Sequence, residues 1–449
     1  MTARTPFAFL ALSAAQTNAN FTNLELRCHT VKPGIPFRSR LLWPTLWLGM
    51  IILSASPSSS QDWPQWRGPR RDGVVVGYRE PKAWPETLEK RWQVEVGAGH
   101  ASPVVLGQRI YVHTRHGENE VVSALDLGSG KILWQDNYPV PYTMDPAATG
   151  HGKGPKSTPA IENGRLYTFG ISGILSCYDA EQGHLLWRKA FTKQFKATSP
   201  QYGASASPLV ESGRVIIHVG GYNQGALIAF DAASGEARWS WNGDGPGHAS
   251  PIVVELEGGR QLVTQTQQFL VGVSLSSGQL LWKIPFKTEY DQNIITPVAH
   301  EHVLLFSGFA KGVQAIRAQN QGNHWVTQKV WENPRESMYM SSPVISENLV
   351  FGFSHTQKGH FFCLDLRNGA TLWTSQGRQG ESASVVSAGG YLIFLTDDGT
   401  LTVVRKSPKG FEPVRRYTVA DSPTWAHPVV LSGQILVKDE LHLTSWKVE

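Results

Sequence analysis

The residues best suited to chemistry lie in short, glycine-containing loops that precede a recurring Ser/Thr-Pro dipeptide. The loop before Ser102 holds His100, and the loop before Thr158 holds His151 and two lysines. Imidazole, ammonium, phenol, amide and carboxylate groups that meet at one place could orient and hold a small ligand. We expect such a site to be lined by His100, His151, Lys153, Lys156, Gln201, Tyr202, His248, Asp291, Asn293, Tyr339, Glu381, Trp425 and His427.

Two histidine pairs have spacings that can recruit a metal ion, but neither has a third ligand in register. They are His113 with His116 and His300 with His302, and each pair falls on or beside an expected strand. Since a zinc site needs three or four protein ligands, we expect exposed strand-end histidines and no metal site. Motifs of serine hydrolases, P-loop enzymes and zinc proteases do not occur. The sequence therefore assigns no catalytic residue and favours a protein that is not an enzyme.

The charge distribution argues against a nucleic-acid partner. The chain has a formal net charge of +5, and residues 1–60 contain five Arg and Lys residues against one Glu, which is +4. The remaining 389 residues therefore carry about +1, without a basic stripe. A nucleic-acid-binding domain would concentrate positive charge on its folded part.

The basic N-terminal region is typical of a secretory leader. Arg38 and Arg40 precede the apolar run 41–54 (LLWPTLWLGMIILS), and small residues follow over 55–60. We expect residues 1–60 to be a leader with a signal peptide, which places the protein in the periplasm or outside the cell. An uncleaved leader would instead anchor the chain to a membrane, and after cleavage no spanning helix is expected.

The elements that must position the loop residues follow from an internal repeat. Ala124 to Trp134 (ALDLGSGKILW) recurs as 177–187 (CYDAEQGHLLW), 229–239 (AFDAASGEARW), 272–282 (GVSLSSGQLLW) and 363–373 (CLDLRNGATLW). In each copy a strand runs into an Asp or Ser that can accept hydrogen bonds from the turn. A Gly then supplies a positive φ before a second strand that ends in Trp. Each copy is thus predicted to be a tight hairpin.

The recurring dipeptide adds an opening strand before each hairpin. Eight openings occur, at Ser102, Thr158, Ser207, Ser250, Thr296, Ser342, Ser384 and His427, and all but Ser384 are followed by Pro. With a further short strand between opening and hairpin, each unit has four strands, which is the signature of a β-propeller. We predict an all-β, eight-bladed β-propeller of four-stranded antiparallel blades over 90–449. The strand near Trp92 should pair with the C-terminal blade and close the ring.

The repeat resembles the pyrroloquinoline-quinone-like (PQQ-like) propeller repeat, and is similar to the tryptophan-docking repeat of PQQ-dependent dehydrogenases and of BamB, an outer-membrane assembly lipoprotein. The resemblance implies that the repeat tryptophans lie between neighbouring blades, and that the aspartates and glycines form the hairpins. These structural residues are Asp126, Gly130, Trp134, Asp179, Gly183, Trp187, Asp231, Gly235, Trp239, Gly278, Trp282, Asp365, Gly369 and Trp373.

Residues 61–89 form an N-terminal arm before the propeller. Within it, the motif from Asp62 to Gly73 (DWPQWRGPRRDG), with Trp63, Trp66 and Arg67, resembles a stretch that often precedes secreted PQQ-like propellers. We expect these residues to pin the N-terminal arm against the propeller. The alternative is a lid over the channel.

By this resemblance the protein is an exported binding or protein-interaction scaffold in the cell envelope. It would be a monomer that needs no cofactor and binds envelope proteins, or a small ligand such as a carbohydrate or peptide at its mouth. The alternative is a quinoprotein alcohol or sugar dehydrogenase that holds PQQ with calcium. That alternative lacks the adjacent cysteines of the family, since Cys177 and Cys363 stand alone.

Overall fold

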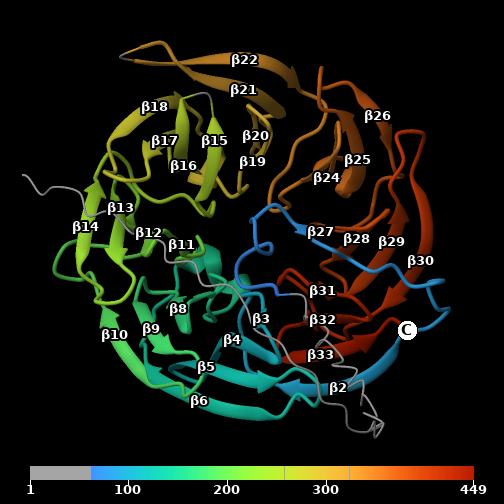
Figure 1. The fold of residues 1–449 in the computed structure, drawn as a ribbon, viewed down its shortest axis with the longest axis horizontal. Coiled ribbons are helices and arrows are strands. Elements are labelled where there is room, and N and C mark those ends of the chain that lie inside the picture. The colour runs from blue at the N-terminus through green and yellow to red at the C-terminus, as the bar shows by residue number, and fades with distance from the viewer. Residues whose placement is uncertain (1–61, 257, 323) are drawn as a thin grey trace, which may run out of the picture. The chain divides into compact units, whose positions relative to one another are not determined.

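The computed structural model describes residues 62–256, 258–322 and 324–449 (Figure 1). The predicted leader, residues 1–60, lies outside the described residues. Among the described residues, strands form eight antiparallel sheets around a common axis, so the predicted all-β, eight-bladed propeller is confirmed. The helices of this part are three short 3-10 turns, Pro146–His151, Glu289–Asp291 and Thr356–Lys358. None of its helices is long and apolar enough to cross a membrane.

The blades are numbered here in chain order, each from its inner to its outer strand. Blade 1 is β3 (Val104–Leu106), β4 (Arg109–His116), β5 (Asn119–Asp126) and β6 (Ile132–Pro139). Blade 2 is β7 (Ala160–Glu162), β8 (Arg165–Phe169), β9 (Leu175–Asp179) and β10 (Leu185–Lys189). Blade 3 is β11 (Leu209–Glu211), β12 (Arg214–Gly221), β13 (Gln224–Asp231) and β14 (Ala237–Trp241). Blade 4 is β15 (Ile252–Leu256), β16 (Gly259–Gln265), β17 (Phe269–Ser274) and β18 (Leu280–Pro285).

The second half of the ring follows the same order. Blade 5 is β19 (Val298–His300), β20 (Val303–Ser307), β21 (Val313–Asn320) and β22 (Trp325–Asn333). Blade 6 is β23 (Val344–Ser346), β24 (Leu349–Ser354), β25 (His360–Asp365) and β26 (Thr371–Thr374). Blade 7 is β27 (Ala383–Ala388), β28 (Tyr391–Thr396), β29 (Thr400–Arg405) and β30 (Glu412–Thr418), with β1 (Val74–Val75) beside β27. Blade 8 is β31 (Val429–Leu431), β32 (Gln434–Lys438), β33 (His442–Lys447) and β2 (Glu89–Glu95).

Blade 8 closes the ring with strands from both ends of the described chain. The expected pairing of the strand near Trp92 is present, because β2 runs antiparallel to β33 with Gln93 opposite Thr444 and Glu95 opposite His442. Without β2 the outer edge of β33 would be unpaired, and such an edge invites association with another chain.

Neighbouring blades are joined by the tryptophan of one blade and the hairpin of the next. The Trp134 indole donates from Nε1 to the Ala180 carbonyl, 3.0 Å away. The same ring covers Gly183, whose φ is +77° and where a Cβ would lie 2.5 Å from Trp134 Cδ2. Asp179 braces this hairpin by accepting from the backbone N–H groups of Glu181 and Gln182. Glycine is therefore required by both the turn and the ring above it.

The other repeat tryptophans follow this arrangement with two exceptions. Trp282 donates to Gln261 Oε1 within its own blade, and Trp187 Nε1 has no partner among the described residues. The carbonyl that Trp187 would reach, that of Ala232, accepts from the Tyr167 hydroxyl instead. The regular interblade bonds run from Trp92 to Leu127, Trp239 to Leu275, Trp331 to Leu366 and Trp373 to Ser407. Trp446, on the third strand of blade 8, instead donates back to the Val419 carbonyl, which follows the outer strand of blade 7.

The Ser/Thr-Pro openings form a chain of hydrogen bonds around the channel. At six openings the hydroxyl accepts from a backbone N–H of the preceding blade, and one of these bonds, from His427 N to Ser102 Oγ at 2.8 Å, joins blade 8 to blade 1. This explains why Ser or Thr recurs there, since the backbone N–H groups are buried and need an acceptor. The other five run from Ser102 to Thr158, Thr158 to Ser207, Ser207 to Ser250, Ser250 to Thr296 and Thr296 to Ser342. Between blades 6 and 7 the bond runs in the opposite direction, because Ala383 N donates to the hydroxyl of Ser341.

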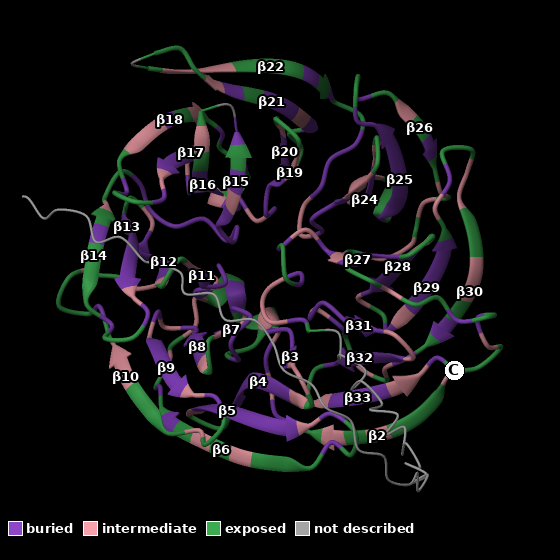
Figure 2. Cartoon of the chain, in the orientation of Figure 1, coloured by how far each residue is buried: buried purple, intermediate pink, exposed green. Residues whose placement is uncertain are grey.

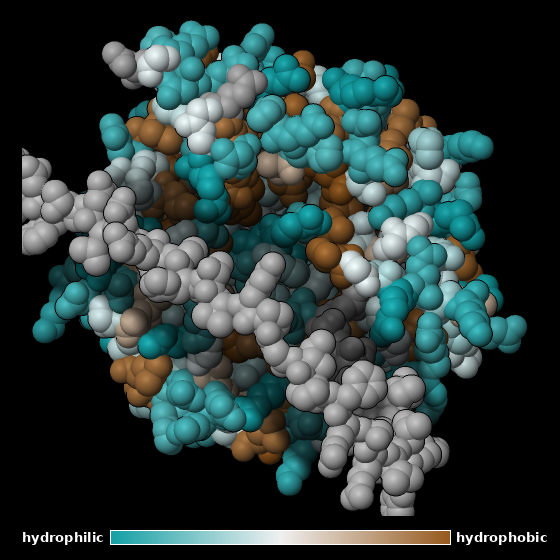
Figure 3. Space-filling view, in the orientation of Figure 1, coloured by the Kyte–Doolittle hydropathy of each residue, from teal (hydrophilic) through white to brown (hydrophobic). Residues whose placement is uncertain are grey.

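The core lies in the inner part of each blade and between blades. β4, β5, β12 and β13 are buried almost throughout, whereas nearly all residues of the outer strands β6, β10 and β14 are exposed or half-buried (Figure 2). On the face shown in Figure 3, hydrophilic side chains cover most of the rim, with hydrophobic patches between them, and further hydrophobic side chains lie deeper in the upper part of the ring. Aromatic and aliphatic burial of this extent supplies the main stabilisation of a propeller.

Candidate binding site at one mouth of the channel

The innermost strand of every blade begins at its opening, so the loops before the openings meet at one end of the channel. There they enclose a cavity of about 120 Å³. Residues from the loops of seven blades line it, and only blade 7 contributes none. The lining residues are His100, His151, Lys156, Tyr202, Ser205, His248, Gln292, Ile294, Tyr339, Met340 and Trp425.

Aromatic rings form one wall of this mouth pocket. His100 stacks on Trp425 with ring centroids 5.7 Å apart and an interplanar angle of 23°. His151 meets both Trp425 and Tyr202 edge-on, at 5.9 and 5.7 Å. Tyr202 also approaches the ring of His248, at 6.1 Å. Such edge-to-face and offset arrangements are the favourable geometries for aromatic rings, so the rings of the wall stabilise one another.

Lys156 supplies the pocket's cation. Its Nζ donates to the Tyr202 carbonyl at 2.6 Å, and it makes no ion pair with a carboxylate of the described residues. Burial lowers the pKa of Lys156 to about 8. No Asp or Glu belongs to the lining residues, so the pocket is electropositive wherever Lys156 is protonated.

The histidines of the pocket are held neutral. Burial, reinforced by the charge of Lys156, lowers the pKa of both His100 and His248 to about 3, and burial also lowers that of His151. His248 Nδ1 lies 2.7 Å from Ser205 Oγ, whereas its buried Nε2 has no partner among the described residues. A neutral imidazole bound at one nitrogen presents the other to a ligand.

The structure brings seven of the predicted site residues together in this pocket. They are His100, His151, Lys156, Tyr202, His248, Tyr339 and Trp425. Four further residues line it that were not predicted, Ser205, Gln292, Ile294 and Met340. Each is within two residues of a predicted one or of an opening. Position in the loop, rather than chemical type, was therefore the signal that could have found them.

The other six predicted residues do not line the pocket. Two are tied down in the mouth loops: Lys153 pairs with Glu118 at 3.6 Å, and Gln201 donates to Asp145 at 3.0 Å. Asp291 pairs with Lys287 at 3.0 Å, and the Glu381 side chain is exposed.

Asn293 and His427 are buried in supporting positions. The Asn293 amide donates to the carbonyls of Thr266 and Phe286, at 2.8 and 2.6 Å, which fixes the loop before blade 5. His427 lies inside the channel, with its ring edge-on to that of Trp66, at a centroid distance of 4.5 Å.

The expectation of exposed strand-end histidines is wrong for His113. Its side chain is fully buried, with Nε2 3.4 Å from Glu120 Oε2. Glu120 also accepts from the Tyr138 hydroxyl and the Ile171 backbone N–H, at 2.6 and 2.7 Å. β4 lies inside its blade, so even a polar residue of this strand is enclosed and needs buried partners. In the part of the chain that the structure describes, no cluster of three or more His, Cys, Asp or Glu side chains could hold a metal ion.

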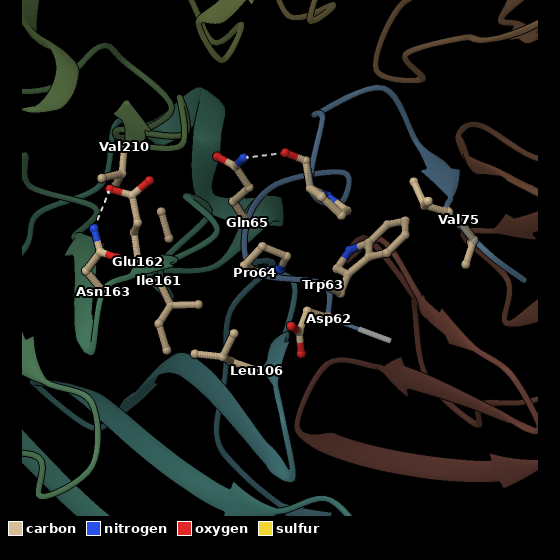
Figure 4. Close-up of a pocket in the computed structure, with 13 residues that line it drawn as sticks. Asp62, Trp63, Pro64, Gln65, Val75, Leu106, Ile161, Glu162, Asn163 and Val210 are labelled. Carbon is tan, nitrogen blue, oxygen red and sulfur yellow. Dashed lines mark hydrogen bonds between the residues drawn. The ribbon is translucent and has the colours of Figure 1, made fainter. Parts of the chain in front are cut away.

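The N-terminal arm fills the channel from the end opposite the mouth pocket. Trp63 bridges to Val105, the Pro64 carbonyl accepts from Ile161 N at 2.9 Å, and β1 pairs in parallel with β27. These contacts all involve the inner strands β3, β7 and β27, which surround the channel (Figure 1). A surface pocket of about 510 Å³ lies there between the arm and blades 1 to 3 (Figure 4).

Three arm side chains reach up to the level of the openings. Trp66 Nε1 donates to Thr296 Oγ1 at 3.1 Å, and Arg71 donates to the carbonyls of Ser207 and Pro208 at 3.1 and 2.9 Å. Arg67 donates to the Pro343 carbonyl and, at 3.1 Å, to that of Asp72. Both arginines are buried, which lowers the pKa of Arg67 to about 10 and that of Arg71 to about 9. The arm thus closes the channel below the mouth pocket.

Comparisons with known proteins place the chain among PQQ-like propellers. The family model described as outer membrane protein assembly factor BamB matches residues 117–375. BamB of Shewanella oneidensis is 25% identical over 276 residues, which cover 56% of this chain and 65%, just under two thirds, of that protein. BamB of Yersinia pestis is 22% identical over 369 residues, which cover 78% of this chain and 86% of that protein.

Quinoprotein dehydrogenases are similar over a shorter stretch. The quinohemoprotein alcohol dehydrogenase ADH-IIG of Pseudomonas putida is 27% identical over 166 residues, 35% of this chain and 20% of that protein. Among solved structures, BamB from Moraxella catarrhalis has a TM-score of 0.60 at 16% identity, covering 80% of this chain and 98% of that chain. A europium-containing methanol dehydrogenase has a TM-score of 0.62 at 14% identity, covering 85% and 90%. These two structures show the shared fold.

Proposed function

Because the chain belongs to the PQQ-like propeller family described as outer membrane protein assembly factor BamB, we propose that it is an exported binding protein that acts as an interaction scaffold in the cell envelope. The observation that carries this proposal is the mouth pocket, which the loops of seven blades build together. The partner is an envelope protein or a small ligand received at that mouth. The proposed export rests on the leader expected over residues 1–60 and on the envelope role in the relatives' names.

The pocket favours binding over catalysis. Its single nucleophile–base contact is Ser205 with His248, and the second nitrogen of that histidine has no orienting carboxylate among the described residues. A histidine whose pKa is lowered to about 3 is also a poor general base near neutral pH. The pair therefore serves to hold the loop, and no reaction is assigned to it.

The second candidate, a PQQ-dependent oxidoreductase, is favoured by the distant dehydrogenase relatives. The residues of this mouth do not fit a tricyclic quinone beside a hard cation. The cavity of about 120 Å³ is smaller than the roughly 300 Å³ at the low end of pockets for drug-sized ligands. Its lining has no carboxylate to bind calcium, and Cys177 and Cys363 are separate, buried thiols. The quinoprotein hypothesis is thus the weaker of the two.

Site-specific photo-crosslinking in the native host tests the proposal. A benzophenone side chain at Tyr202, in the mouth, should capture envelope proteins, and Trp425→Ala should abolish that capture. The same side chain at Val76, which is 56% exposed on the arm at the far end, is the matched control. Crosslinks from Val76 alone would contradict a binding mouth. Tight one-to-one uptake of PQQ with calcium, with dye-linked alcohol oxidation, would establish the dehydrogenase instead.

A further inference from the structure

The mouth pocket carries an uncompensated positive charge. Lys156 Nζ uses one of its three N–H donors on the Tyr202 carbonyl, and no carboxylate lines the cavity. Lys438 lies close by, since its buried Nζ donates to the Gly99 carbonyl at 2.6 Å, but the charges of Asp439 and Glu440 act on it. The acid that acts on His151 is Glu381, whose side chain is exposed. A partly buried cation of this kind favours an anionic ligand.

A second polar residue belongs to the lining of the same cavity. His248 lines the pocket, and its Nε2 is buried without a partner among the described residues. When Nδ1 accepts the Ser205 hydroxyl, the proton of the neutral ring is at Nε2, which makes it a hydrogen-bond donor. The Tyr339 hydroxyl, by contrast, is occupied by Gln292. The free donors of the pocket are therefore those of Lys156 and His248.

The size and walls of the pocket limit what can enter. A volume of about 120 Å³ is that of roughly four water molecules in liquid water, so it accommodates a group the size of one side chain. Ile294, Met340 and the Trp425 ring supply apolar surface beside the two donors. Such a combination suits an anionic head on a short hydrocarbon stem.

We propose that the mouth pocket binds a single carboxylate on a short apolar stem, with Lys156 and His248 as its donors and Trp425 as its apolar wall. This assignment rests on the proposed function of the mouth as a binding site. The carboxylate can belong to an acidic side chain or chain end of a partner protein, or to a free small carboxylic acid. Both present the same chemistry to the pocket.

Calorimetric titration of the purified protein tests the assignment with three probes of similar size and different charge. Propionate should bind saturably, whereas propionamide and propylammonium should not. Lys156→Gln should weaken propionate binding about tenfold or more, the loss expected for a hydrogen bond to a charged group. Lys153→Gln is the matched control, because that lysine lies in the same loop but pairs with Glu118 outside the pocket. It should leave binding unchanged.

A second measurement covers the case in which Lys156→Gln fails to fold. In the wild-type protein labelled biosynthetically with ¹³C at the lysine ε-carbon, which leaves the ammonium group unmodified, propionate should shift the Lys156 NMR signal and leave that of Lys153 in place. A short acidic peptide, compared with its amide, distinguishes a protein partner from a free acid as the source. Equal binding of propionate and propionamide, or an unshifted Lys156 signal, would overturn the assignment. Mouth crosslinks that persist in that event would leave the proposed function intact.

Discussion

Buried histidines make single residues of this propeller sensitive to acid. His427 lies in the channel against Trp66, and burial, helped by the charge of Arg67, lowers its pKa to about 3. In the unfolded chain the same group takes up a proton near pH 6.5. Between these two values the unfolded state binds more protons, so stability is full above pH 6.5 and is lost as the pH falls.

Replacing His427 with Phe should flatten this pH dependence. Phe keeps an aromatic ring against Trp66 and has no group to protonate, so the acid loss of about 2 kcal/mol expected from one such histidine at pH 5 disappears. Urea unfolding at pH 7, 6 and 5 measures the slope. His184→Gln, at an exposed hairpin histidine, is the control and should follow the wild type. Parallel slopes for His427→Phe and the wild type would show that this ring is not a source of acid sensitivity.

For single residues, the sequence predicted which loops form the site better than it predicted which side chains of those loops line the pocket. Lys153 and Lys156 are three residues apart in one loop, yet one pairs with Glu118 at the rim and the other lines the pocket. Asn293 has a polar side chain like its neighbour Gln292, but it faces inward to three carbonyls. Neighbouring loop side chains take different positions because each contacts a different part of an adjacent blade. Which contact each one makes cannot be inferred from a single sequence.

Within a blade, two separate constraints require glycine at the hairpin position. Its φ is positive, and the tryptophan of the preceding blade lies directly on it. The two constraints can be separated because some glycines of the ring meet only the first. Gly213, between β11 and β12, has φ +71°, and a Cβ added there would have no neighbouring atom within 4 Å among the described residues.

Gly183→Ala should therefore destabilise the protein more than Gly213→Ala. Both substitutions strain the backbone by about 1–2 kcal/mol. Gly183→Ala also places a methyl 2.5 Å from the Trp134 ring, which adds roughly 1–3 kcal/mol of overpacking. Urea unfolding of the two variants gives the difference. Equal losses would mean that the Trp134 ring moves aside freely and that docking does not depend on the glycine.

Most elements could be predicted from the sequence because their signals repeat. Asp, Gly and Trp at fixed spacing define the hairpins, and Ser/Thr-Pro marks the inner strands. Blade 5 shows the limit. Its outer strands β21 and β22 extend to Asn320 and Trp325 without the Asp-Gly turn, and Trp282 of blade 4 bonds within its own blade. The role of the opening hydroxyls was not predictable, because it is a bond between blades rather than within one.

For the whole molecule, the ring depends on strands that are distant in sequence. The sequence predicted its closure from a count, because the C-terminal unit lacks one strand and the segment near Trp92 supplies one. It predicted an arm packed on the propeller, but the depth of that arm in the channel follows from three-dimensional packing of Trp66, Arg67 and Arg71. The mouth pocket consequently has a floor, and a ligand enters and leaves from one end.

Two truncations separate the contributions of arm and closing strand. A chain that begins at residue 79 loses the arm's channel contacts but keeps β2, so it should remain a monomeric propeller that is a few kcal/mol less stable, given the loss of buried Trp63. A chain that begins at residue 97 also loses β2 and leaves the edge of β33 unpaired, so it should associate or fail to fold. For both chains, light scattering measures association and circular dichroism measures folding and thermal stability. A monomeric residue-97 chain as stable as the residue-79 chain would show that blade 8 does not need its N-terminal strand, and that the ring is held by contacts between blades alone.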